Sequence, residues 1–335
     1  MKSLSTRLAH AVLPAFLIAA TATFAQTTEL KVLNTFDGRY QGTPLVLEPF
    51  LEAARTASKG RLTFRTSGPE VVPAAEQFQP VQKGAFDMLF TVQPWHVSVT
   101  SASMGIYALE PDPDGWRKNG IIDFLDREYQ RVGTKLLAIV PGNIAGNGTF
   151  HALLKEEVKP GQDLNGRKIR GVPTYKGFAE PLGASLITLQ GGEIYGALQR
   201  GTIDGVFWPV IGAIDFKWYE QAKFMLRPRW GTSYHFLLAN LDRFNKLEPE
   251  LRAVLVEEGR KAELNGQKAF DDRLRRELVL LAEKGLKETM IDKDKFERAR
   301  ESYNQGAWSM GLTSKAGGEQ AKQFQDFVRS KGLAK

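Results

Sequence analysis

The sequence from Asp163 to Pro209 reads DLNGRKIRG, continues through LGASLITL and EIYGALQRGTIDG, and ends in VFWP. The basic segment Gly166–Gly171 predicts a strand, and a short helix leads from it to a second predicted strand around 186–189. A second helix is predicted from about Glu193 to Arg200, because Gly201 follows it as a stop signal. Strand, helix, strand and helix in this order are typical of a doubly wound α/β lobe.

A similar alternation precedes this stretch. Strands are predicted at Glu29–Asn34, at Arg61–Arg65 and at the apolar segment Phe86–Val92. Between them, helices are predicted over Gly42–Ser58, from the spacing of its apolar residues, and over Glu76–Lys83, which ends before a glycine. This βαβαβ pattern predicts a first lobe of its own.

A long helix is predicted in the last third of the chain. It opens at Glu248-Pro249, since proline suits the first helical turn, and no proline follows from Glu250 to Lys284. About 35 residues correspond to roughly 50 Å at 1.5 Å per residue. A coiled coil is one interpretation, but the apolar spacing keeps no strict heptad. We therefore expect a helix that spans two lobes, followed by helices at Asp292–Gly306 and Gly317–Gly332.

The amino terminus has the pattern of a secretory signal peptide. Lys2 and Arg7 form a basic start, an apolar run extends from Ala11 to Ala20, and small residues follow. The apolar run is shorter than the roughly 20 residues that span a bilayer. We expect cleavage after Ala25, with Ala22 as the alternative. The other interpretation is a hydrophobic first helix of a cytosolic protein.

The composition limits the remaining possibilities. The chain has 335 residues, enough for two domains, and its formal net charge is +7, which removal of Lys2 and Arg7 would lower to +5. A basic surface raises the local concentration of anions, but export argues against nucleic acid as a partner. The sequence contains no cysteine, which excludes disulfides, thiolate metal sites and cysteine nucleophiles.

Five segments in this order resemble one known family: the substrate-binding subunits of tripartite ATP-independent periplasmic (TRAP) transporters, of the DctP type. They are FLEAARTASKGRLTF (Phe50–Phe64), VQKGAFDM (Val81–Met88), the two strings DLNGRKIRG and EIYGALQRGTIDG, and LEPELRAVL (Leu247–Leu255). The resemblance covers nearly the whole mature chain. It implies a two-lobed α/β fold, the type II periplasmic binding protein fold, with hinge-linked lobes and a long helix across both.

The resemblance also sets the expected organisation of the chain. We expect a signal peptide at 1–25, a first lobe from 26–147 and about 236–275, and a second lobe from 148–235 and about 276–335. The expected protein is a periplasmic monomer exported by a Gram-negative cell. It would bind a small-molecule carboxylate, work with TRAP membrane subunits, and need no cofactor or metal.

Arg170 is the leading candidate for the ligand site. It ends a predicted strand, and in open α/β sheets the ligand crevice lies beyond the carboxyl ends of the strands. Its guanidinium is a planar fork that pairs with a carboxylate through two hydrogen bonds. In the family that the chain resembles, the arginine at this place holds the substrate carboxylate. The alternative is a surface arginine beside Arg167 and Lys168.

The sequence departs from the familiar family pattern in three places. Phe150, next to His151, stands where many members have a second arginine, and Trp208 stands where many have an asparagine. Sialic-acid-type members have an aromatic residue where this chain has Gly191-Gly192. These changes favour a ligand with one carboxylate and an apolar or aromatic body over a sugar acid or a dicarboxylate. Ordinary core packing is the alternative for both aromatic residues.

Three further residues are candidates from their positions in the chain. Trp95 follows the strand Phe86–Val92 and would overhang the cleft from the first lobe. Glu70 and Gln41 lie in loops after strands, where they would receive ligand hydroxyls or amines. For each of them, packing or hinge structure is the alternative.

The function expected from these observations is capture of a small organic acid without chemistry on it. His96, His151 and His235 are far apart in the chain and show no metal-ligand spacing, and no G-x-S-x-G elbow or Walker loop is present. Two alternatives stay open. One is a binding protein that serves a chemoreceptor or sensor, and the other is a periplasmic enzyme without a recognisable motif.

Overall fold

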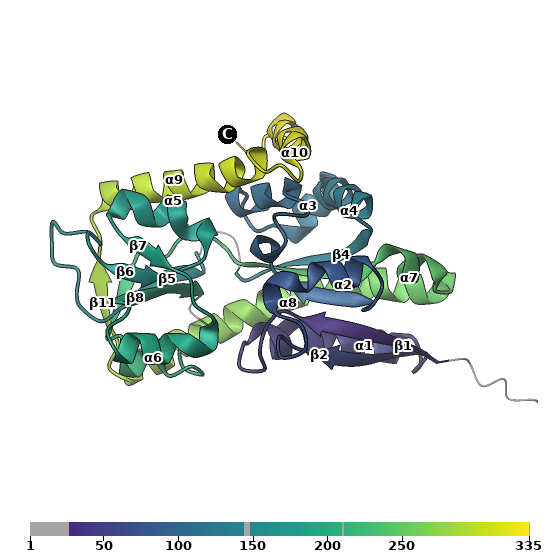
Figure 1. The fold of residues 1–335 in the computed structure, drawn as a ribbon, viewed down its shortest axis with the longest axis horizontal. Coiled ribbons are helices and arrows are strands. Elements are labelled where there is room, and N and C mark those ends of the chain that lie inside the picture. The colour runs from purple at the N-terminus through teal and green to yellow at the C-terminus, as the bar shows by residue number, and fades with distance from the viewer. Residues whose placement is uncertain (1–26, 144–147, 210, 335) are drawn as a thin grey trace, which may run out of the picture.

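The computed structural model describes residues 27–143, 148–209 and 211–334, and shows two lobes, each built on its own β-sheet (Figure 1). The predicted signal peptide, 1–25, lies outside the described residues. So does most of the glycine-rich connection that follows the first lobe. The two-lobed α/β fold predicted from the sequence is confirmed.

The first lobe contains a five-stranded sheet in the order β2-β1-β3-β10-β4. Its first three strands pair in parallel, whereas β10 runs antiparallel to both β3 and β4. The strands are β1 (Thr28–Asn34), β2 (Leu62–Ser67), β3 (Met88–Thr91), β4 (Thr134–Pro141) and β10 (Tyr234–Asn240).

The second lobe contains a six-stranded sheet in the order β11-β9-β5-β8-β6-β7. Strands β6, β7 and β8 pair in parallel, and β5 runs antiparallel to its neighbours β8 and β9. The strands are β5 (Phe150–Leu154), β6 (Lys168–Arg170), β7 (Ser185–Ile187), β8 (Gly205–Pro209), β9 (Phe224–Arg227) and β11 (Lys287–Met290).

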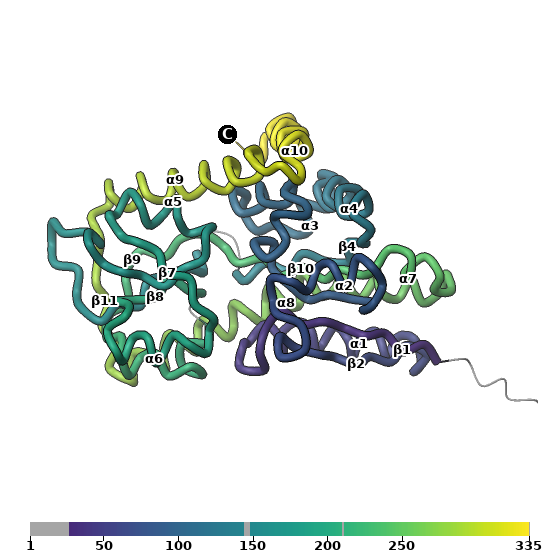
Figure 2. Tube along the Cα trace, viewed as in Figure 1, coloured from purple at the N-terminus to yellow at the C-terminus, as the bar shows by residue number. Residues whose placement is uncertain are grey.

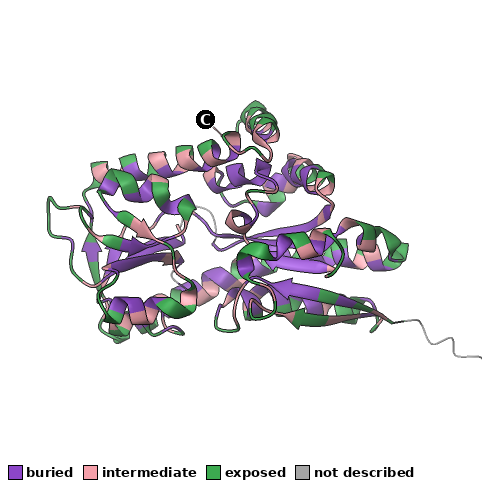
Figure 3. Ribbon diagram, viewed as in Figure 1, coloured by how far each residue is buried: buried purple, intermediate pink, exposed green. Residues whose placement is uncertain are grey.

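Helices cover both sheets, so that the central strands are largely buried, whereas the edge strands β2, β7 and β11 are partly exposed (Figure 3). The α-helices are α1 (Glu48–Ala57), α2 (Phe78–Gln82), α3 (Pro113–Lys118), α4 (Ile121–Arg131), α5 (Lys176–Ala179), α6 (Ile194–Gln199), α7 (Leu241–Lys246), α8 (Pro249–Glu283), α9 (Lys293–Leu312) and α10 (Gly318–Ser330). A π-helical turn, η1 (Thr43–Leu47), precedes α1, and seven short 3₁₀ segments are described: η2 (Ala74–Glu76), η3 (Gln93–Trp95), η4 (Ala102–Ala108), η5 (Pro173–Tyr175), η6 (Glu180–Leu182), η7 (Gly191–Glu193) and η8 (Trp218–Glu220). None of the helices in these described ranges is long and apolar enough to cross a membrane.

The long helix α8 runs across both lobes, as the sequence predicted (Figure 1). Its buried residues join a single apolar cluster that includes Leu137 of the first sheet and Trp218 of the second lobe. Gly259 lets the helix lie close to β4, because a Cβ there would be 2.6 Å from the carbonyl oxygen of Leu137. The helix therefore serves as a shared support for the two sheets.

The C-terminal part of the chain departs from the expected lobe boundaries, because its last helix packs on the first lobe. Helix α9 starts beside α5 of the second lobe and continues to the first lobe, where it packs on η4 (Figure 2). Phe324 and Val328 of α10 lie in the apolar cluster of the first lobe with Leu125 of α4, so this end of the expected segment 276–335 belongs to the first lobe. Strand β10 likewise begins at Tyr234, slightly before the expected boundary.

Two buried carboxylates fix α8 to the two lobes. Glu263 accepts the N–H of Ile139 in β4 at 3.0 Å and forms an ion pair with Arg117 at 2.5 Å. Further along the helix, Glu277 accepts the N–H of Ile214 in the second lobe at 3.0 Å. Because each carboxylate satisfies a buried backbone donor, α8 is held in one register against both lobes.

Replacement of Glu263 by alanine is expected to destabilise the protein. The change leaves the N–H of Ile139 and the partly buried guanidinium of Arg117 without their partner, which typically costs about 3 kcal/mol. Urea denaturation of Glu263→Ala and wild type measures this difference. The control is Glu257→Ala on the same helix, whose exposed pair with Arg260 should matter little. Equal stability of the two variants would contradict the anchoring role.

Candidate functional site

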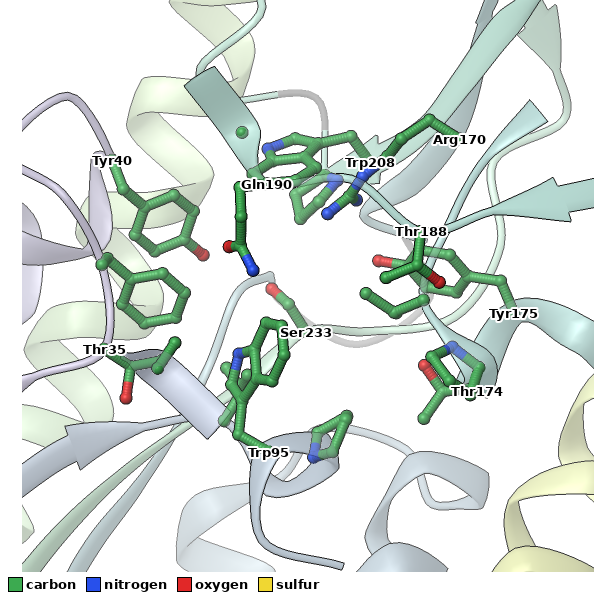
Figure 4. A pocket seen from close by; sticks show the side chains of 18 of the residues that line it. Thr35, Tyr40, Trp95, Arg170, Thr174, Tyr175, Thr188, Gln190, Trp208 and Ser233 are labelled. Carbon is green, nitrogen blue, oxygen red and sulfur yellow. The ribbon is translucent and has the colours of Figure 1, made fainter. Parts of the chain in front are cut away.

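A cavity of about 490 Å³ lies between the lobes, where strands of both sheets end (Figure 4). From the first lobe, Thr35 follows β1 and Trp95 follows β3. From the second lobe, Arg170 ends β6, Thr188 follows β7, and Trp208 lies in the last part of β8. This is the crevice position at which open α/β sheets bind ligands, because the loops that follow the strands meet there.

The lining of the cavity is mainly apolar and aromatic, with few charges. Among the described lining residues, the charged ones are Arg170 and Asp37. Asp37 forms an ion pair with Arg39 at 3.0 Å, so its charge is already balanced. The cavity therefore presents one cation whose charge is not matched by a neighbouring acid.

Arg170 is held by contacts that leave one edge of its guanidinium facing the cavity. Its Nε donates to the carbonyl of Leu189 at 3.0 Å, and one terminal nitrogen, Nη1, lies 3.5 Å from the carbonyl of Phe207. The ring of Trp208 lies against the guanidinium face, with 4.3 Å between the guanidinium carbon and the ring centroid. In Figure 4 the guanidinium points into the space between the lobes.

The environment of Arg170 is unusual for a charged side chain. The residue is 3% exposed, and none of the ion pairs found within the described ranges involves it. Burial lowers the pKa of Arg170 to about 10, so the guanidinium remains charged at neutral pH. A buried charge is costly unless it is paired and hydrogen-bonded, and the contacts described for this guanidinium are two carbonyl groups and one aromatic ring.

Five of the residues predicted from the sequence line this cavity: Arg170, Trp208, Phe150, Trp95 and Gly191. They come from five different strands or connections and from both lobes. Phe150 is 3% exposed and its ring lies 4.9 Å from that of Tyr175, so it packs as well as lines the cavity.

Three predicted residues are not brought into the site. His151 is fully buried on the face of β5 opposite to Phe150, because successive side chains of a strand point to opposite faces. Glu70 is exposed and accepts the N–H of Gly68 at 2.7 Å. Gln41 is outside the lining, and its carbonyl accepts the N–H of Leu45 at the start of the helical segment.

Several lining residues were not predicted from the sequence. Thr35 and Phe36 directly follow β1, so the rule that ligands bind beyond strand ends would have found them. Tyr175 lies five residues after Arg170 and follows the same rule. Tyr107 and Ser233 carry no such signal, since one lies in a 3₁₀ segment and the other in a connection between lobes.

A loop of the first lobe, residues 36–42, reaches the second lobe beside the cavity. The ring centroids of Tyr40 and Trp208 are 6.4 Å apart, and the guanidinium carbon of Arg39 lies 4.9 Å from the ring centroid of Phe216. The hydroxyl of Tyr40 is 2.6 Å from Nε2 of His235, a fully buried residue of β10. The contacts with Trp208 and Phe216 bridge the two lobes at the edge of the cavity, and the contact with His235 holds the loop on the first lobe.

No group of three or more histidine, aspartate or glutamate side chains that could hold a metal ion is found in the described part of the chain.

The family model for bacterial extracellular solute-binding proteins, family 7 (DctP), matches residues 115–308. The chain belongs to this family. The predicted identity as a DctP-type TRAP solute-binding protein is thereby confirmed.

Curated relatives of this DctP-family protein carry related names. A solute-binding protein of Albidiferax ferrireducens is 27% identical over 259 residues, which cover 72% of this chain and 74% of the relative. A monocarboxylate 2-oxoacid-binding periplasmic protein of Nostoc is 30% identical over 216 residues, covering 60% of this chain and 57% of the relative.

Solved structures show the same fold. A TRAP transporter solute-binding protein of Bordetella bronchiseptica, with calcium and picolinate in its site, has a TM-score of 0.77 at 16% identity, over 92% of this chain and 93% of that one. DctP6 of Bordetella pertussis, which binds pyroglutamic acid, has a TM-score of 0.76 at 20% identity, over 90% of this chain and all of that one. These similarities confirm the two-lobed binding-protein fold.

The buried histidines of this DctP-family protein are expected to make it less stable in mild acid. Burial lowers the pKa of His96 to about 3 and that of His235 to about 4, and it lowers the pKa of His151 well below its usual value. In the unfolded chain these groups take up protons near pH 6.5. The part of the free energy of unfolding that depends on these histidines is therefore fully kept above pH 6.5. It falls as the pH drops toward 4, by up to about 1.4 kcal/mol per pH unit for each histidine.

Urea denaturation at pH 7, 6 and 5 measures this loss. His96→Gln should reduce the loss of stability between pH 6 and pH 5, because one protonating group is removed. An equal loss in His96→Gln and wild type would show that His96 is accessible to protons in the folded state.

Proposed function

We propose that this protein is a periplasmic receptor that captures a small organic acid and delivers it to the membrane subunits of a TRAP transporter. The acid has one carboxylate, held by Arg170, and an apolar or aromatic body. The observation that carries the proposal is the buried guanidinium of Arg170, which faces an interlobe cavity without an acidic partner among the described residues.

The geometry of Arg170 defines how the carboxylate binds. Because Nε is engaged by the carbonyl of Leu189, the ligand meets the guanidinium through the edge formed by its two terminal nitrogens. The two oxygens of a carboxylate match that edge in spacing and plane, which a lysine ammonium would not. The ring of Trp208 keeps the guanidinium plane fixed, so little rotamer freedom is lost when the acid binds.

The remaining lining supports an apolar body for the acid. Trp95 lies across the cavity from Arg170 in Figure 4, and Phe36, Tyr40 and Phe150 add aromatic surface. The acids named for the relatives described above, picolinate, pyroglutamic acid and a monocarboxylate 2-oxoacid, each bear a single carboxylate. A second carboxylate would find no free cation among the described residues that line the cavity.

Capture requires that both lobes contact the ligand. Hinge closure between two lobes is the movement typical of periplasmic binding proteins. Here the lobes are joined by paired connections, in which Gly142 donates to the carbonyl of Ser233 at 2.7 Å and Thr149 donates to that of Gly231 at 2.8 Å. Since Arg170 and Trp95 lie in different lobes, a ligand that touches both stabilises the closed arrangement.

Removal of the Arg170 guanidinium is expected to weaken acid binding strongly. In Arg170→Ala the ligand carboxylate would be buried without a partner, which costs about 2–5 kcal/mol, or roughly 30-fold to several-thousand-fold in Kd. Arg170→Lys should also bind poorly, because an ammonium cannot supply the planar fork. Calorimetric titration with an acid selected by a thermal-shift screen of organic acids measures both variants.

Arg167→Ala is the matched control for these variants. Arg167 precedes β6 but donates to the carbonyls of Glu156 and Glu157, each at 2.7 Å, and is not part of the cavity lining. Its replacement should leave Kd close to that of wild type. Binding by Arg170→Ala within threefold of wild type would place the carboxylate elsewhere and contradict the proposal.

A further inference from the structure

The hydroxyl groups that line the cavity beside Arg170 include those of three buried residues. These residues are Tyr107 of the first lobe, Tyr175 of the second lobe and Ser233 of the connection that enters β10. Each of the three residues is 6% exposed. In Figure 4 the hydroxyls of Tyr175 and Ser233 point into the space between the lobes.

The buried Oγ of Ser233 has no hydrogen-bond partner, and no hydrogen bond to the protein is found for the hydroxyls of Tyr107 and Tyr175 among the described residues. Two other buried tyrosines of the first lobe are satisfied within the protein. Tyr129 lies 2.8 Å from Nε2 of His96, and Tyr234 donates to the carbonyl of Leu109 at 2.9 Å. Buried polar groups are hydrogen-bonded in the great majority of cases, so the unpartnered Oγ of Ser233, beside two tyrosine hydroxyls on the same cavity, indicates a ligand that pairs with them.

The surrounding packing holds the hydroxyls in place. The ring of Tyr107 lies edge-on to Tyr234 at 5.2 Å, and that of Tyr175 lies edge-on to Phe150 at 4.9 Å. The N–H of Ser233 donates to Oγ1 of Thr149 at 3.0 Å, which fixes the backbone from which its hydroxyl projects. Groups positioned in this way bind a matching atom with little additional loss of freedom.

We propose that the hydroxyls of Tyr107, Tyr175 and Ser233 form a hydrogen-bonding subsite for a neutral oxygen of the bound acid. The ligand is then a hydroxy- or oxo-substituted acid, with its carboxylate at Arg170 and the second oxygen at this subsite. The inference rests on the proposed function, since it assumes a carboxylate at Arg170.

The chemistry of the subsite excludes a charged second group. Burial raises the pKa of both tyrosines. Tyr303 and Tyr175 add to the rise at Tyr107, and Arg170 opposes the rise at Tyr175 without cancelling it, so both remain neutral donors at physiological pH. No cation other than Arg170 lines the described cavity to balance a second carboxylate, and Asp37 is already paired with Arg39. A hydroxyl or carbonyl oxygen suits three hydroxyl groups, because it accepts from them without carrying charge.

Matched acids that differ by one oxygen test the subsite. The reference probe is 3-phenylpropanoate, which has no oxygen besides its carboxylate. Its 2-oxo derivative, phenylpyruvate, adds an oxygen next to the carboxylate, and 3-(4-hydroxyphenyl)propanoate adds one far from it. Calorimetric titration of the full mature protein should show that at least one oxygenated acid binds about threefold to tenfold more tightly than 3-phenylpropanoate.

Three variants then locate the preference in the protein. In Tyr107→Phe, Tyr175→Phe and Ser233→Ala, the ratio of the Kd of 3-phenylpropanoate to that of the preferred oxygenated acid should fall toward one, most fully in the triple variant. The matched control is Tyr234→Phe, which removes a buried hydroxyl that is bonded to Leu109 and does not line the cavity. This control should keep the wild-type ratio.

Two results would overturn the subsite while leaving the carboxylate site intact. One is equal Kd values for all three acids in wild type, and the other is a triple variant with the wild-type ratio of the Kd of 3-phenylpropanoate to that of the preferred acid. Failure of the proposed function gives a different result. In that case none of the three acids binds to wild type, or all of them bind to Arg170→Ala as they do to wild type.

Discussion

The buried guanidinium of Arg170 is the interaction on which the rest of this structure depends. Its position follows from the short parallel strand β6, whose neighbours β7 and β8 lead into the carbonyls of Leu189 and Phe207 that hold it. A charge in this setting is stable only if dipoles and aromatic surface replace water around it. The protein supplies three such contacts, and in the proposed function the ligand carboxylate supplies the next one.

The two-lobed architecture places the other half of the site opposite this charge. Helix α8 supports both sheets, and its buried Glu263 and Glu277 fix it to a backbone N–H in each lobe. Helix α9 is a second link between the lobes, and the paired connections around Thr149 and Ser233 are a third. The carboxyl ends of the first sheet, with Trp95, are thereby held across the cavity from Arg170.

Much of this arrangement could be predicted from the sequence, because helix spacing and strand ends are local signals. The long helix, strands β1, β2, β3, β6 and β7, and the place of Arg170 at the end of β6 were found in this way, whereas β5, β8 and β10 were not predicted. Strands β9 and β11 were missed, since their pairing joins residues about 60 positions apart. His151 was misplaced because a shift of one residue along β5 moves a side chain to the other face of the sheet. Tyr107 and Ser233 reach the cavity only through tertiary packing.

A comparison of one and two negative charges on the same ligand body tests most directly whether the cavity is built for a monocarboxylate. Calorimetric titration with 3-phenylpropanoate and 3-(4-carboxyphenyl)propanoate makes this comparison. A single unpaired cation predicts that the dicarboxylate binds at least about a hundredfold more weakly, because its second charge would be buried without a partner. A dicarboxylate that binds as tightly as the monocarboxylate, or more tightly, would contradict the assignment of Arg170 as the one charge that the ligand meets.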